Sequence, residues 1–249
     1  MPPSMDIDPV PRLVALLRTH AGRLNGRVVA EMYENPFWED RFGARGRRFA
    51  QEDGESHVAH LVLALEGRSP ALLTSYVRWL QRVLTTRGVC SRHVAENFQR
   101  LAAVIREERW DGAGLAVEYL DGARSALRHG SEPARSIEES EPALVGAAVG
   151  SGAADRLPRG EEDVRDLVSY AADALWNERW DLFAAHLDWY QGFLGRRGVE
   201  PDALPRLLDV LRRESTTVTP ASSGESFRAL LDHDLDLAGQ TRPVPPTSS

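Results

Sequence analysis

Two histidines in the first half of the chain have the spacing that most directly suggests chemistry. His57 and His60 lie three positions apart, so on a helix both imidazoles project from nearly the same side. Such a pair can bind a tetrapyrrole or supply two ligands to one metal ion, although a zinc or iron site normally needs a third and a fourth donor. The alternative is a hydrogen-bonded histidine at the margin of a core. We favour the absence of a cofactor and keep tetrapyrrole or metal binding through His57 or His60 as the alternative.

Nearby carboxylates and the single cysteine are weaker signals. Glu52 and Asp53 could complete a di-iron site with His57, but such sites need Glu-x-x-His motifs on two helices. Negative charge in the first turn of a helix explains both carboxylates without a metal. Cys90 precedes a predicted helix and lies near His93, yet no orienting third group accompanies them. We therefore interpret Cys90 as structural and predict no catalytic residue.

The segment 35–48, NPFWEDRFGARGRR, combines aromatic residues with arginines. Arginine beside exposed aromatic surface suits an anionic ligand or an acidic partner segment. Its glycines lack the spacing of a phosphate-binding P-loop. The alternative is that the segment folds back and its aromatic side chains plug a helical bundle. Together with the two histidines, the predicted ligand- or partner-binding residues are Phe37, Trp38, Arg41, Phe42, Arg45, Arg48, His57 and His60.

The elements that position these residues are repeated along the chain. Residues 52–101 align with residues 162–211 at a constant offset of 110 and without a gap, with Trp79 on Trp189. Apolar positions pair with apolar positions throughout, which favours a duplicated helical unit. His57 aligns with Leu167 and His60 with Tyr170, so both histidine positions are expected at or near a core.

Apolar residues at helical spacing and the Pro and Gly residues that end each run predict an all-α protein. The expected helices cover 10–33, 50–65, 70–86, 91–107, 112–128, 161–177, 179–196 and 202–214, with segments 35–48 and 131–160 as a connector and a loose loop. The predicted architecture is two pseudo-repeated helical-bundle units, with a globin-like arrangement as one option. Unit 1 is expected at 9–108, unit 2 at 111–214, and a disordered or flexible tail at 215–249 with one short helix at 225–237.

The composition excludes several classes of protein. The 249 residues are 42% hydrophobic, enough for real cores, and their formal net charge of −7 argues against broad nucleic-acid binding. No apolar run approaches the roughly 20 residues that cross a bilayer, and no signal peptide is recognisable at Met1. A lone cysteine fits a reducing compartment. We predict a cytoplasmic protein that binds neither nucleic acid nor membrane.

The order of these motifs resembles bacterial all-helical sensory domains. A long first helix precedes YENPFWEDRFGARGRRF, then ED-xxx-H, then PALLTSYVRWL and a terminal RGV. Similar segments occur in stress-signalling proteins with non-haem globin-like folds and before cobalamin-binding modules. The resemblance implies a sensory or interaction element coupled to an output module, and no cobalamin-binding, kinase or cyclase region follows here.

Three functional hypotheses follow from the sequence. The first is a non-catalytic sensory or regulatory protein that binds a partner protein, a small apolar or anionic ligand, or both, with a homodimer as a further option. The second is a tetrapyrrole- or metal-binding protein that uses His57 or His60. The third is an enzyme whose site is assembled between the two helical units.

Overall fold

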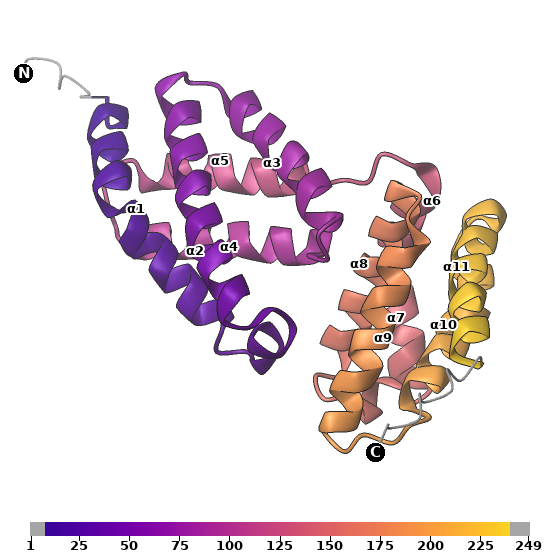
Figure 1. The fold of residues 1–249 in the computed structure, drawn as a ribbon. Helices are drawn as coiled ribbons and strands as arrows, with labels where there is room; N and C mark the ends of the chain where they lie inside the picture. Colours follow the sequence, from indigo (N-terminus) through magenta and orange to yellow (C-terminus); the bar gives the residue numbers. More distant parts are fainter. Residues whose placement is uncertain (1–7, 240–249) are drawn as a thin grey trace, which may run out of the picture. The chain divides into compact units, whose positions relative to one another are not determined.

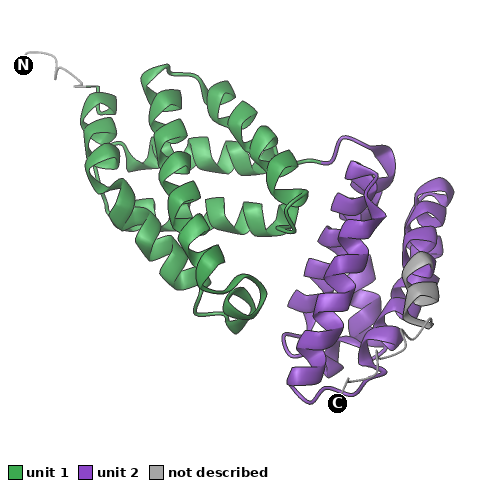
Figure 2. Cartoon of the chain, in the orientation of Figure 1, with its two compact units in different colours: residues 1–128 green, residues 129–249 purple. Residues whose placement is uncertain are grey.

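The computed structural model describes residues 8–239, with side chains as far as Asp232. Within this range the secondary structure consists of α-helices and one short 3-10 helix, without strands, and the all-α prediction is confirmed (Figure 1). The chain divides into two compact units, residues 1–128 and 129–249 (Figure 2). None of the described helices combines the length and the apolar character that crossing a membrane requires.

The described part of unit 1, from residue 8 onward, forms five helices in two layers. They are α1 (Val10–Met32), α2 (Pro36–Glu66), α3 (Pro70–Thr85), α4 (Ser91–Glu107) and α5 (Ala113–Ser125). In Figure 1, α1, α2 and α3 form one layer, and α4 and α5 cross behind it. Proline residues in the first turns of α1, α2 and α3 start these helices, because the missing N–H would be unpaired there anyway. The fully buried core includes Leu13, Leu17, Leu24, Leu61, Leu65, Leu73, Phe98 and Ile105.

The aromatic and basic segment 35–48 differs from its prediction because most of it is helical. Asn35 caps α2, and its side-chain oxygen accepts a hydrogen bond from the backbone N–H of Phe37 at 3.0 Å. Gly43 then interrupts the helix with φ 58° and ψ −164°, a conformation that is essentially restricted to glycine. The segment is therefore a short helical turn, 36–42, joined to the long part of α2 through Gly43.

Unit 2 begins with helices that the sequence patterns did not predict. It contains α6 (Glu132–Glu139), α7 (Glu141–Gly150), the 3-10 helix η1 (Ala154–Arg156), α8 (Glu161–Asn177), α9 (Trp180–Arg196), α10 (Ala203–Val218) and α11 (Ala221–Gly239). The prediction of a loose loop at 131–160 is wrong. The segment has few large apolar residues, so its periodic signal is weak. The apolar residues that it does have are buried: Ala134, Ile137, Leu144, Val145 and Ala148.

The predicted flexible tail at 215–249 is also wrong over most of its length. Helix α10 continues to Val218, and α11 packs against α6, α8 and α10. Phe227, Leu230 and Leu231 are 0% exposed, because their i, i+3, i+4 spacing places them on one face that meets the unit. Residues 240–249 lie outside the described residues.

The boundary between the units lies after Arg128 and not near residue 110 as predicted, since α5 packs on α3 and α4. The predicted duplication itself stays a prediction. Two tryptophans at the offset of 110 have similar neighbours. The ring centroids of Trp79 and Tyr76 are 6.0 Å apart with planes inclined by 31°, and those of Trp189 and His186 are 5.9 Å apart with planes inclined by 32°. Trp79 is 58% exposed, and Trp189 is less so.

Candidate functional site

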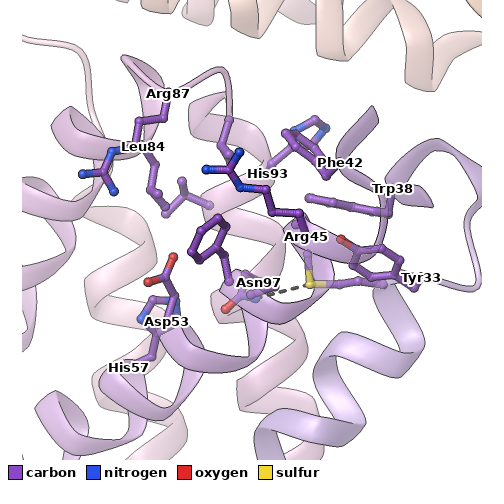
Figure 3. Close-up of a pocket in the computed structure, with 16 residues that line it drawn as sticks. Tyr33, Trp38, Phe42, Arg45, Asp53, His57, Leu84, Arg87, His93 and Asn97 are labelled. Carbon is purple, nitrogen blue, oxygen red and sulfur yellow. Dashed lines mark hydrogen bonds between the residues drawn. The ribbon is translucent and has the colours of Figure 1, made fainter. Parts of the chain in front are cut away.

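A cavity of about 470 Å³ lies inside unit 1, among α1, α2, the end of α3 and the start of α4 (Figure 3). This volume falls within the range of small-molecule sites, about 300–1,000 Å³. Figure 3 shows Tyr33 and Trp38 toward one end of the cavity and Asp53 with His57 toward the other. Every lining residue belongs to unit 1, so the candidate site is formed by this unit alone.

One face of α2 supplies most of the chemistry of the cavity. Arg45, Phe49, Asp53 and His57 follow one another at intervals of four residues, and all four line the cavity. Residues four apart on an α-helix lie on the same face, one turn above the other. The helical part of α2 after Gly43 therefore presents a cation, an aromatic ring, a carboxylate and an imidazole in a row.

The remaining walls are largely apolar. Trp38 and Phe42 come from the turn before Gly43, with ring centroids 5.5 Å apart, and the glycine break lets them face the same cavity as the later part of α2. The other apolar lining residues are Met32, Leu84, Val89 and Val94. Asn97 adds an amide, which donates a hydrogen bond to the Met32 sulfur at 3.3 Å (Figure 3). The cavity thus favours a ligand with a substantial apolar body.

Three charged side chains line this apolar cavity. Asp53 is half-buried, and Arg45 and Arg87 are exposed. None of the three has a hydrogen bond or an ion pair with the described residues, and the Arg45 guanidinium lies 5.4 Å from the Phe49 ring centroid. Burial raises the pKa of Asp53, and the nearby charge of Arg87 partly opposes this. The cavity therefore offers charged groups of both signs that form no ion pair with the residues that the structure describes.

His57 is a buried, neutral member of the site. It is 4% exposed, its Nδ1 lies 2.7 Å from the Tyr76 hydroxyl, and its ring stacks on Phe98 at 4.9 Å. Burial, and to a smaller extent the charge of His60, lowers the pKa of His57 to about 3. The ring is thus uncharged near neutral pH and available for hydrogen bonding in its neutral form.

His60 does not join His57 in a shared ligand site. Its Nδ1 lies 2.8 Å from the Ser56 carbonyl oxygen, and its ring is stacked on Tyr76 outside the cavity. Within residues 8–239, no cluster of three or more His, Cys, Asp or Glu side chains includes His57 or His60. The geometry therefore gives no support to metal binding by this pair.

The structure brings four of the eight predicted site residues together around the cavity: Trp38, Phe42, Arg45 and His57. The other four, Phe37, Arg41, Arg48 and His60, do not line it. The expectation of exposed aromatic surface is wrong for Phe37 and Trp38, which are 1% and 6% exposed and pack against His93 at 5.1 and 4.8 Å. Cys90 is also buried, at 1% exposed, which fits its structural interpretation.

Sequence reasoning missed several lining residues, among them Tyr33, Phe49, Arg87 and Asn97, and assigned Asp53 only to helix stabilisation. The four-residue spacing from Arg45 to His57 was the available signal. Gly43 and Gly46 hide this signal, because they favour a connector over 35–48 and a helix that begins only at about residue 50.

Comparisons of the chain with protein-family models, curated proteins and solved structures found no match.

Proposed function

We propose that unit 1 is a non-catalytic sensory or regulatory module whose cavity binds a small, largely apolar molecule that carries an anionic group. The observation that supports this most is one cavity in which apolar walls meet two guanidinium groups, Arg45 and Arg87, that have no ion pair with the described residues. Apolar walls supply binding free energy, and a guanidinium selects an anion such as a carboxylate.

A small molecule is favoured over a protein partner by the burial of Trp38. Protein-binding hot spots present Trp and Arg on an accessible surface. Here Trp38 is 6% exposed and lies in the wall of a cavity, which is open to solvent where Arg45, Phe49 and Arg87 are exposed. Tetrapyrrole or metal binding has no supporting geometry at His57 and His60.

The proposal is tested by titration calorimetry of the full chain with sodium octanoate and with 1-octanol. Octanoate should bind about tenfold or more tightly than octanol, because a charge-assisted hydrogen bond contributes about 1.5–3 kcal/mol. Arg45→Gln should remove most of this preference.

Arg48→Gln is a matched control. Arg48 lies at the same 5.4 Å from the Phe49 ring centroid as Arg45, but it does not line the cavity and lies 3.9 Å from Glu52 instead. Its substitution should leave octanoate binding unchanged. Absence of octanoate binding, or equal losses in both variants, would contradict the proposed function.

A further inference from the structure

The two units contain an aspartate at matching positions, and these two aspartates differ in burial and in ion pairing. Asp53 of α2 and Asp163 of α8 are related by the offset of 110 that aligns the two halves of the sequence. Asp163 is 2% exposed, whereas Asp53 is only half-buried and lines the cavity. Comparing the two shows which partner a carboxylate at this position has when it is buried.

In unit 2 a cation of the protein itself satisfies the carboxylate. The Arg159 backbone N–H donates to Asp163 Oδ2 at 2.9 Å, and the Arg159 guanidinium pairs with Asp163 Oδ1 and with Asp166 at 2.8 Å. Burying a carboxylate without such a partner is costly, while an ion pair with additional hydrogen bonds offsets that cost. Arg159 therefore allows Asp163 to be enclosed.

In unit 1 the matching cation is missing. Arg159 lies four positions before Asp163, and the residue four positions before Asp53 is Phe49, an apolar side chain that lines the cavity and cannot pair with a carboxylate. The charge of Arg87 acts on Asp53 without forming an ion pair with it. A ligand that fills the cavity would bury Asp53 further, and a purely anionic ligand would add repulsion between like charges.

We propose that the ligand of unit 1 carries, besides its anionic group, a cationic nitrogen that pairs with Asp53 as Arg159 pairs with Asp163. This inference rests on the proposed function and narrows its ligand to amphoteric molecules. Arg45 and Asp53 are eight residues apart on one helix, about 12 Å along its axis. The ligand therefore has its anion at Arg45, its cation at Asp53, and an apolar middle part at Phe49.

The test compares three probes of equal chain length on the full-length protein: 8-aminooctanoate, octanoate and octylammonium. On the unchanged chain, 8-aminooctanoate should bind about tenfold or more tightly than octanoate, as expected for an added charge-assisted hydrogen bond. Asp53→Asn should abolish that difference in affinity without weakening the binding of octanoate. Asp53→Glu, which keeps the charge, should retain most of it.

Glu52→Gln serves as the control, since Glu52 is the exposed neighbour of Asp53 and does not line the cavity. It should leave all three affinities unchanged, and circular dichroism melts confirm that each variant is folded. Equal binding of octanoate and 8-aminooctanoate to the unchanged chain would overturn the inference and leave the proposed function intact. Failure of octanoate and 8-aminooctanoate to bind at all would overturn both.

Discussion

The rings of His60 and Tyr76 lie face to face in unit 1, with centroids 3.6 Å apart and planes inclined by 8°. At the offset of 110, Tyr170 and His186 stack in unit 2 at 3.6 Å and 16°, with the two residue types exchanged. Each unit thus has a stacked tyrosine and histidine between two neighbouring helices, α2 and α3 in unit 1 and α8 and α9 in unit 2. Stacking area, rather than a role for either histidine as a ligand, explains why aromatic residues occupy both positions.

Tyr76 also tests the hydrogen bond to His57. Tyr76→Phe keeps a ring for stacking but removes the hydroxyl that lies 2.7 Å from His57 Nδ1. Because a buried polar atom then loses its partner, the free energy of unfolding should fall by about 1–3 kcal/mol in urea titrations. Tyr119→Phe is the control, since Tyr119 has no side-chain hydrogen bond with the described residues. Equal effects of the two variants would show that the hydroxyl contact contributes nothing.

Unit 1 should lose stability in acid because of His57. Burial lowers the pKa of His57 from 6.5 to about 3, so the folded state stays neutral while the unfolded state takes up a proton below pH 6.5. Stability therefore declines from pH 6.5 toward 3, and by pH 4.5 this one group costs about 2–3 kcal/mol. Hydrogen exchange resolved along the chain should show weaker protection of α2–α4 in acid. His57→Gln should flatten the profile, and an unchanged profile would rule out this origin.

Unit 2 should respond to pH in the opposite direction because of His129. Burial lowers the pKa of this residue, but hydrogen bonds of 2.9 Å to Asp173 and to Glu138 outweigh burial and raise it to about 9. Protonated His129 therefore adds about 3 kcal/mol to the free energy of unfolding. This contribution is fully present below pH 6.5 and is lost as the pH rises through 9. Hydrogen exchange in α6 and α8 should accelerate over this range beyond its intrinsic dependence on pH. In His129→Gln that excess should disappear; if it persists, another group is responsible.

Gly43→Ala should destabilise unit 1 through the backbone. The conformation with φ 58° and ψ −164° is strained for any residue with a side chain, although an added Cβ would have open space around it. The expected loss is about 1–3 kcal/mol. Gly122→Ala is the matched control, because Gly122 is exposed on α5 and an added Cβ again meets nothing within 4 Å. That change should stabilise by about 0.5–1 kcal/mol, and a similar gain at Gly43 would contradict the strained geometry.

Phe227→Ala should destabilise unit 2, because Phe227 is 0% exposed on α11. Removing a buried phenyl ring leaves a cavity that costs about 3–5 kcal/mol. Val149→Ala, at a 37% exposed position of α7, should change the free energy of unfolding by less than about 1 kcal/mol. Chemical denaturation of the full chain measures both variants. A negligible effect of Phe227→Ala would show that α11 contributes little to the stability of unit 2.

The all-α class and the bounds of two strongly periodic helices can be predicted from the amino-acid sequence. Ser91–Glu107 and Glu161–Asn177 were predicted at their observed ends, because their apolar stripes and the adjacent Gly or Pro residues act locally along the chain. The residue types of segment 35–48 and the His57/His60 spacing also indicate Trp38, Phe42, Arg45 and His57, all four of which line the cavity.

Which weakly periodic segments form helices, and which side chains line one cavity, depends on tertiary contacts. Segments 132–150 and 221–239 contain few large apolar residues, and they are helical because distant segments of unit 2 bury the few that they have. The cavity likewise needs Arg87 from the turn after α3 and Asn97 from α4 beside one face of α2. Periodicity reports which face of a helix is apolar, but it does not report what covers that face, since the covering residues are remote in sequence.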